Sequence, residues 1–168
     1  MLKKTLLGIL AVVVAIGAFL VYGKYTSIMA PNVSMDLETQ IVLIPTNSSF
    51  SEVVDILYTN QQIIDTASFR EVSEMMSYKK PIMRAGRYKI SPNWSNRSLI
   101  GHLRAGAQEP VNLVFNYGWL LEDVAAKAAQ FIEPDSTKLI NLFFDENAIK
   151  VYGYTTETLM GLFIPYTY

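Results

Sequence analysis

The stretch that decides the fold is QIVLIPTNSSFSEVVDILY, residues 40–58. Residues 41–44 are apolar and mostly β-branched, which is typical of a short strand, and a turn rich in Pro, Asn and Ser follows. Ser49 and Glu52 then have the spacing of a capping box at the start of a helix. The apolar residues from Phe50 to Tyr58 recur at the helical period. The stretch therefore predicts a strand that runs through a turn into an amphipathic helix.

Similar units recur along the rest of the chain. A second helix is expected from Ser68, capped by Glu71, and further strands are expected at residues 86–90 and 111–115. Three more helices are predicted. The first ends at Gly106, the second carries an apolar face from Leu121 to Ile132, and the third covers about residues 137–144. The order strand, helix, helix, strand, helix, strand, helix, helix predicts an α+β fold, with a small sheet that has helices on one side.

An uncharged run from Thr5 to Gly23 precedes these units. As a helix it is about 28 Å long, close to the ~30 Å hydrocarbon thickness of a bilayer. Lys3 and Lys4 favour the cytoplasmic side, so we expect the N-terminus inside and the chain after Lys24 outside. A cleaved signal peptide is the alternative, but signal segments are usually shorter and the end of this run is a poor cleavage context.

The predicted domain organisation follows from these elements. Residues 1–25 form a cytoplasmic tip and a transmembrane anchor, and residues 26–39 a linker. Residues 40–106 have the strand–helix–helix–strand order of a LysM-like glycan-binding module, an order that many other small units share. Residues 107–168 form a second α/β segment. The apolar run that ends this segment has no helix to pack on, so we expect a chain cut at the entry to further structure.

Composition excludes several function classes. Of the 14 basic residues two precede the anchor, so the exported part has 12 basic against 15 acidic residues and a net charge of −3. Without a basic stripe, nucleic acid is not an expected partner. The chain has no cysteine, and His102 is its single histidine. Thiolate and histidine metal sites and Ser/His triads are therefore not expected, and no cofactor is predicted.

No catalytic, cofactor-binding or metal-binding residue is predicted from the residues themselves. The carboxylates are interpreted as helix caps or solvated loop groups, among them Glu52, Glu71, Glu122, Asp123, Asp135, Asp145, Glu146 and Glu157. His102, Trp94 and Trp119 are interpreted as structural residues that cover core, although an exposed aromatic ring is also able to stack on a sugar. Asn-x-Ser matches begin at Asn32, Asn47, Asn93 and Asn96, and they are interpreted as turn residues rather than glycan acceptors.

Three segments together resemble the endolytic murein transglycosylases of the MltG/YceG-like family. Residues 84–92, RAGRYKISP, and 99–106, LIGHLRAG, are similar to the family pattern AGxYxxxP…LxxLxxG. Residues 111–125 stand where the family has a strand, a Gly-containing turn and a helix. Residues 162–168, LFIPYTY, resemble the family's LFPDTY-like stretch in a form similar to that of Bacteroidetes-type bacteria. The chain departs from the pattern at Tyr166, where Asp or Asn is usual, and at residues 116–118, where Pro-Glu-Gly is usual.

The resemblance implies an anchored enzyme of the bacterial inner membrane with its domain in the periplasm. Such enzymes cleave glycan strands of nascent peptidoglycan to 1,6-anhydro-muramic ends, with one carboxyl as acid and then base. The implied partners are peptidoglycan glycan strands, the bilayer through residues 5–23, and peptidoglycan synthases. The family's catalytic Glu lies in a later helix, so no residue here receives that role. If this chain were active by itself, Glu146 and Glu157 would be the first residues to test.

Two other readings remain open. One is a non-enzymatic single-pass envelope or cell-division scaffold with a POTRA-like interaction domain, and the other is a eukaryotic type II glycoprotein that uses the four Asn-x-Ser sites. Sequence beyond residue 168 discriminates between the enzyme and the scaffold. On the enzyme reading, we expect residues 162–168 to form the leading strand of the next domain, with an open edge.

Overall fold

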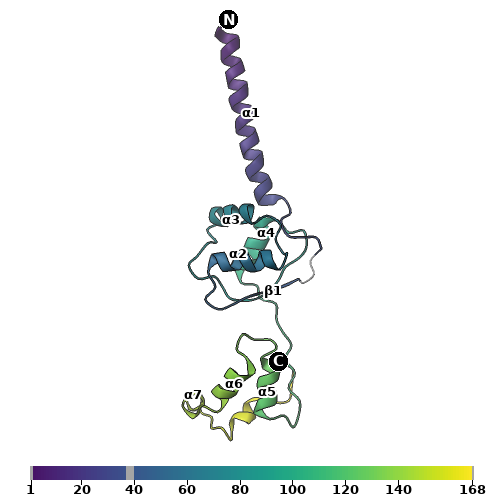
Figure 1. Cartoon of the computed structure of the whole chain (residues 1–168), viewed down its shortest axis with the longest axis vertical. Helices are drawn as coiled ribbons and strands as arrows, with labels where there is room; N and C mark the ends of the chain where they lie inside the picture. The colour runs from purple at the N-terminus through teal and green to yellow at the C-terminus, as the bar shows by residue number, and fades with distance from the viewer. Residues whose placement is uncertain (1, 37–39, 168) are drawn as a thin grey trace. The chain divides into compact units, whose positions relative to one another are not determined.

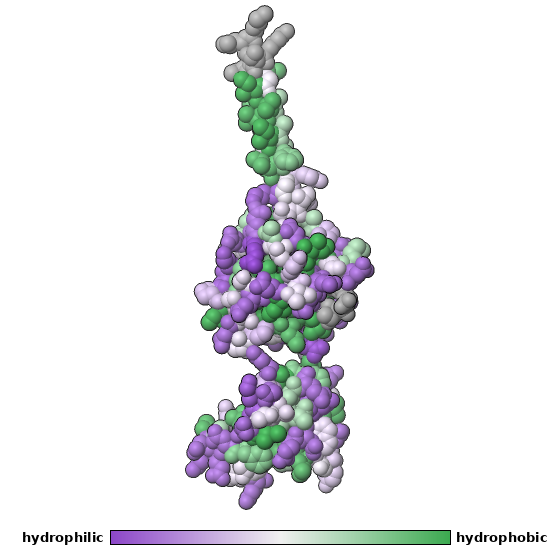
Figure 2. Space-filling view, viewed as in Figure 1, coloured by the Kyte–Doolittle hydropathy of each residue, from purple (hydrophilic) through white to green (hydrophobic). Residues whose placement is uncertain are grey.

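The computed structural model describes residues 2–36 and 40–167. The chain divides into two compact units, Met1–Glu109 and Pro110–Tyr168. Unit 1 begins with a long helix, α1 (Leu2–Met29), which is coloured purple in Figure 1. Within the described residues, Leu7–Met29 is the one stretch of helix long and apolar enough to cross a membrane. Its apolar side chains are exposed, and Figure 2 shows them as a continuous green shaft.

The rest of unit 1 is built on an antiparallel pair of strands. Strand β1 (Ile41–Ile44) pairs with β2 (Gly86–Lys89), with Val42 opposite Tyr88. Three helices complete it, α2 (Phe50–Thr59), α3 (Thr66–Met75) and α4 (Asn96–Ala105). The strand–helix–helix–strand order expected for residues 40–90 is therefore confirmed, as is the capping box of Ser49 and Glu52.

The core of unit 1 lies between the helices and one face of the strand pair. Along β1, Val42 and Ile44 are buried whereas Leu43 is exposed, which is the alternation of a sheet with one covered face. The helices contribute the buried side chains Phe50, Val53, Val54, Leu57, Phe69, Val72, Leu99, Ile100 and Leu103. Because these are the apolar positions of each helical period, the burial pattern follows from the sequence.

Two expectations for unit 1 were wrong. Helix α3 begins at Thr66 with Asp65 as its N-cap, rather than at Ser68 with Glu71, because the Asp65 carboxylate accepts a hydrogen bond from the Ala67 amide at 2.9 Å. The segment expected as a linker is part of the unit over residues 26–36. Helix α1 continues to Met29, and Val33 is 1% exposed within the core. Residues 37–39 of the expected linker lie outside the described residues.

Unit 2 is helical, with α5 (Leu121–Ala128), α6 (Ser136–Phe143), α7 (Glu146–Lys150) and the 3-10 helix η1 (Leu159–Leu162). The strand expected at residues 111–115 is absent from the described chain, since only Val114 forms a bridge, with Thr167. The expected strand at residues 162–168 is reduced to the same bridge, and Tyr168 lies outside the described residues. Both segments are apolar, but a strand persists only where a neighbour satisfies its amides along several residues.

Candidate functional site

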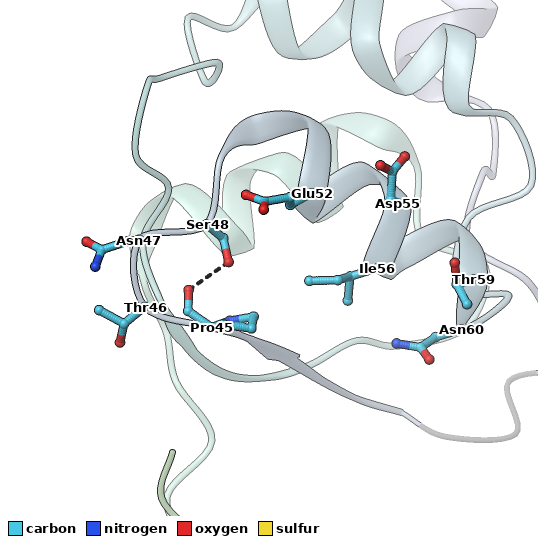
Figure 3. Close-up of a pocket in the computed structure, with 9 residues that line it drawn as sticks. All are labelled: Pro45, Thr46, Asn47, Ser48, Glu52, Asp55, Ile56, Thr59 and Asn60. Atoms are coloured by element: carbon cyan, nitrogen blue, oxygen red, sulfur yellow. Dashed lines mark hydrogen bonds between the residues drawn. The ribbon is translucent and has the colours of Figure 1, made fainter. Parts of the chain in front are cut away.

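A pocket of unit 1 lies beside α2 and the turn that precedes it (Figure 3). It is a shallow cavity of about 470 Å³. Its walls carry hydroxyl, amide and carboxylate groups, and Ile56 supplies an apolar patch. The lining residues are Pro45, Thr46, Asn47, Ser48, Glu52, Asp55, Ile56, Thr59 and Asn60.

The turn between β1 and α2 forms one wall of this pocket. Its shape is fixed by the Ser48 hydroxyl, which donates a hydrogen bond to the Pro45 carbonyl at 2.8 Å, and by Asn47, which has a left-handed backbone with φ of 64°. Asn tolerates this conformation better than most residues. Thr46 and Asn47 are thereby left exposed at the rim, while Ser48 is buried beneath them.

The outer face of α2 forms the other wall. Glu52, Asp55, Ile56 and Thr59 follow at i, i+3, i+4 and i+7, so they share one side of the helix, opposite the buried apolar face. This stripe is visible in the sequence, but the pocket is not, because its depth depends on how the turn folds back. Sequence reasoning identified Glu52 only as a cap and gave no role to Asp55, Thr59 or Asn60.

Glu52 is held in its ionised form. Its carboxylate accepts a hydrogen bond from the Ser49 backbone amide at 2.6 Å, and this bond, with a further one from the Ser49 hydroxyl, lowers the pKa of Glu52. A carboxyl that donates a proton to a glycosidic oxygen needs the opposite shift, upward. Asp55 lies 3.8 Å from the Arg70 guanidinium. The pocket is therefore suited to binding hydroxyl and amide groups and not to acid catalysis.

The other carboxylates considered from the sequence are dispersed over the surface. Asp135 and Asp145 are the N-caps of α6 and α7, and Glu146 and Glu157 are exposed. The pKa values of Asp65 and Glu74 are lowered, by hydrogen bonds from Ser68 and Lys79 respectively. In the described part of the chain, no group of three or more His, Asp or Glu side chains is placed to hold a metal ion.

The aromatic candidates are structural. The ring of His102 lies edge-on to Trp94, with 5.0 Å between centroids, and 6.2 Å from Tyr88. Trp94 is half-buried and packs on the core of unit 1. In unit 2, Trp119 lies 6.3 Å from Phe115 in an edge-on contact. These rings therefore cover core, as the sequence indicated.

The first motif segments, residues 84–92 and 99–106, hold the end of α4 against β2. The Arg84 guanidinium donates to the Ala105 carbonyl at 2.9 Å and fills the space where a side chain on Gly106 would lie. Gly106 itself ends α4 in a left-handed conformation, with φ of 70°. Tyr88 is fully buried, and its hydroxyl donates to the Arg84 carbonyl at 3.1 Å. The residues of this motif therefore have a structural role.

The other two motif segments meet inside unit 2. The Phe115 amide donates to the Tyr166 carbonyl at 3.1 Å, next to the bridge between Val114 and Thr167. The Phe163 ring contacts both Phe115, at 5.5 Å, and Phe143, at 5.4 Å between centroids. Segments 111–115 and 162–167 are thus paired although about fifty residues of sequence separate them.

A solved structure resembles part of the chain. It is the 2.6 Å crystal structure of a YceG-like protein of Listeria monocytogenes, which has 22% sequence identity and a TM-score of 0.38. The match covers 76% of this chain and 47% of that protein, so the chain spans about half of its length. The comparison with curated proteins gives no match.

The family model gives the assignment. The model of the YceG-like family matches residues 42–168, which include unit 1 from β1 onward and all of unit 2. All three motif segments lie inside this range. The chain therefore belongs to the YceG-like family.

Proposed function

We propose that this chain supplies the membrane anchor and the substrate-holding modules of an endolytic murein transglycosylase. The observation that carries the proposal is the family match over residues 42–168, preceded in the same chain by an exposed apolar helix. The reaction cleaves glycan strands of nascent peptidoglycan and closes a 1,6-anhydro ring at the muramic end.

The proposed location is the bacterial inner membrane. α1 crosses it once, with Lys3 and Lys4 on the cytoplasmic side, and the rest of unit 1 and unit 2 lie in the periplasm. In that compartment the substrate strands lie close to the membrane, where they are made. An anchored enzyme meets them before they join the older wall.

The pocket beside α2 is proposed to hold the glycan. Sugars present hydroxyl and acetamido groups, and the pocket offers matching partners in Asn47, Thr59 and Asn60 together with an apolar surface at Ile56. The carboxylates of Glu52 and Asp55 line the same pocket and accept hydrogen bonds from sugar hydroxyls. The order strand, helix, helix, strand, which LysM-like modules share, supports the same assignment.

The catalytic acid is proposed to lie outside residues 1–168. The reaction needs one carboxyl with a raised pKa, whereas Glu52, Asp65 and Glu74 have lowered values. The family's Glu belongs to a helix that follows the segments seen here. The two units then position the strand relative to that helix.

Anhydro-muropeptide analysis tests the proposal. The 168-residue chain, purified in detergent and incubated with peptidoglycan, is expected to release no anhydro products, whereas a chain that joins it to a family segment with the catalytic Glu is expected to release them. Release by the short chain would overturn the placement of the active site, and Glu146→Gln and Glu157→Gln would then be compared first. Inactivity of both chains would favour the scaffold reading.

Glycan binding is tested separately by co-sedimentation with purified sacculi. The short chain is expected to sediment with them, and the double variant Asn47→Ala, Thr59→Ala to sediment less. A matched variant, Asn112→Ala, exposed and outside the pocket, is the control. Equal retention of all three proteins, or retention no greater than that of an unrelated domain, would contradict a glycan site beside α2.

A further inference from the structure

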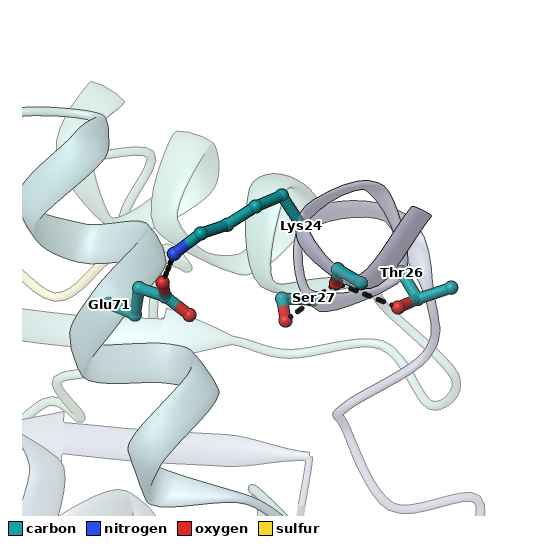
Figure 4. A network of polar contacts seen from close by, with 5 residues as sticks. Lys24, Thr26, Ser27 and Glu71 are labelled. Carbon is teal, nitrogen blue, oxygen red and sulfur yellow. Dashed lines mark hydrogen bonds and ion pairs between the residues drawn. The ribbon is translucent and has the colours of Figure 1, made fainter. Parts of the chain in front are cut away.

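The last turns of α1 pack directly on unit 1. Lys24 of α1 forms an ion pair with Glu71 of α3 (Figure 4). One turn later, the Ser27 carbonyl accepts a hydrogen bond from the Asn96 side-chain amide at 2.9 Å, and Ile28 packs on the core. Helix α1 therefore enters unit 1 as part of its structure.

Two buried asparagines tie this junction together. Asn32, 5% exposed, donates from its side chain to the Asp65 carbonyl at 2.8 Å and to the Asn96 side-chain oxygen at 2.7 Å. Its own side-chain oxygen accepts from the Asp65 amide at 2.7 Å. Asn96, 1% exposed, also donates to the Ser68 hydroxyl at 3.0 Å.

These bonds connect three segments that are far apart in sequence. The Asn32 and Val33 amides both donate to the Trp94 carbonyl, each at 2.9 Å, which adds a backbone connection to the side-chain ones. The bond from Asn96 to the Ser27 carbonyl reaches α1 itself, and the Asn32 and Val33 bonds fix the segment that follows it. A change of angle between α1 and the helices α3 and α4 would break the first bond and strain the others, which leaves buried polar groups unpaired at a cost in free energy. The junction is therefore rigid.

The length of α1 places this junction at the membrane surface. Its 28 residues span about 42 Å, comparable with the ~40–45 Å of a bilayer including its headgroups. The uncharged run ends at Gly23, so Lys24 lies where the hydrocarbon ends. Glu71 is paired with Lys24 and must lie at the same depth.

We propose that α1 and the rest of unit 1 form one rigid body, which holds the outer face of α3, centred on Glu71, in the phospholipid headgroup layer. The proposal rests on the membrane anchorage proposed above. Ala67, Glu71 and Met75 are four residues apart and share this face, and Met75 is 49% exposed.

The partner is a lipid surface. The junction with α1 places α3 at this surface, and no attraction between charges is needed. Glu71 and Glu74 both lie on or beside this face, so it is not a basic patch that seeks anionic lipid. The contact is therefore expected in vesicles made of phosphatidylcholine and phosphatidylethanolamine alone. A requirement for anionic lipid would contradict the proposal.

Site-directed fluorescence measures the depth of α3. The chain has no cysteine, so Met75→Cys and Leu43→Cys each create a single labelling site. Leu43 is the matched control, since it is exposed on β1, on the side of unit 1 away from α1 in Figure 1. Each variant is labelled with bimane and reconstituted into vesicles that contain a lipid with a nitroxide on its headgroup. Loss of fluorescence is expected at position 75 and not at position 43.

A third variant tests rigidity. Four glycines inserted between Gly23 and Lys24, ahead of the contacts that Lys24, Ser27 and Ile28 make with the rest of unit 1, release the membrane-spanning part of α1 in the Met75→Cys background without changing the residues of the core. The fluorescence loss at position 75 is then expected to disappear. Equal loss at positions 75 and 43, or persistence of the loss after the insertion, would overturn the proposal.

Flotation of the vesicles separates this proposal from the one on which it rests. A chain that does not float with the vesicles contradicts the anchorage itself. A chain that floats but shows no fluorescence loss at position 75 leaves the anchorage intact and contradicts the rigid junction.

Discussion

At the scale of single residues, backbone conformation and buried polar groups explain why particular residue types occupy particular positions. Gly106 is the clearest case. Its left-handed φ and the Arg84 guanidinium beside it both disfavour a side chain at this position. The glycine of this motif is therefore needed for the fold of the helix end and not for a reaction. Gly101, in the middle of the same helix, has open space around its α-carbon.

This contrast gives a matched pair of substitutions. Gly106→Ala is expected to lower the free energy of unfolding by about 1 kcal/mol or more, because it strains the backbone and displaces Arg84. Gly101→Ala is expected to raise it by up to about 1 kcal/mol, since alanine favours a helix interior. Urea unfolding followed by circular dichroism measures both. A loss of stability in both variants, or in neither, would refute this account of the motif.

Glu52 predicts a dependence on pH. Its pKa is lower in the folded state than its ordinary value of 4.5, so the ionised form favours folding. That contribution is present above pH 4.5 and is lost as the pH falls through the lower folded value. Glu52→Gln is therefore expected to lose less stability than the wild type between pH 5 and pH 3. Glu122→Gln, in the first turn of α5, serves as a control, and an identical pH profile for wild type and Glu52→Gln would count against the prediction.

At the scale of elements, the periodic helices could be predicted and the isolated strands could not. The face of α2 was evident because its cap and its apolar period agree, which is the condition for reliable local inference. The start of α3 was misplaced because two caps compete there. Ser68 has the local pattern, but Asp65 is fixed by Asn32, thirty-three residues away.

Contacts distant in sequence also explain the other errors. Residues 111–115 have an apolar pattern, but their pairing with the end of the described chain is limited to the bridge of Val114 with Thr167 and the bond from the Phe115 amide to the Tyr166 carbonyl, and no strand forms. α7 is only five residues long, too short to show a period. The pocket beside α2 could also be predicted only in part. The polar stripe along α2 is evident from the sequence, whereas the left-handed turn conformation at Asn47, which forms the other wall, is not.

The buried face of α2 supplies a test at this scale. Val53→Asp is expected to unfold unit 1, because Val53 is fully buried and an unpaired charge there costs several kcal/mol. Ser51→Asp places the same charge on the exposed side of the first turn, where the helix dipole favours it. Thermal unfolding compares the two. A folded Val53→Asp variant with an unchanged melting temperature would contradict the core described here.

At the scale of the whole molecule, unit 1 combines an exposed apolar helix with a packed α+β core, and unit 2 is helical. The orientation of that helix is the property on which the proposed location depends. Lys3 and Lys4 flank its start, and no comparable pair of lysines follows its end.

A reporter that is active only outside the cytoplasm tests this orientation. Fused after residue 40, it is expected to be active, and the same reporter fused ahead of Lys3 is expected to be inactive. Activity assays with immunoblots for expression make the comparison. A stable but inactive fusion at residue 40 would rule out the orientation with the N-terminus inside.

The junction of Asn32 and Asn96 has a mechanical consequence. Helices that cross membranes are tilted by about 20° from the bilayer normal on average, and a helix longer than the local hydrocarbon thickness tilts further. A freely jointed domain would ignore that change, but a body fixed to the helix turns with it, so its far side sweeps sideways by roughly a third of its distance from the pivot at such a tilt. The two asparagines thus make unit 1 a lever, and local membrane thickness sets where its outer side reaches.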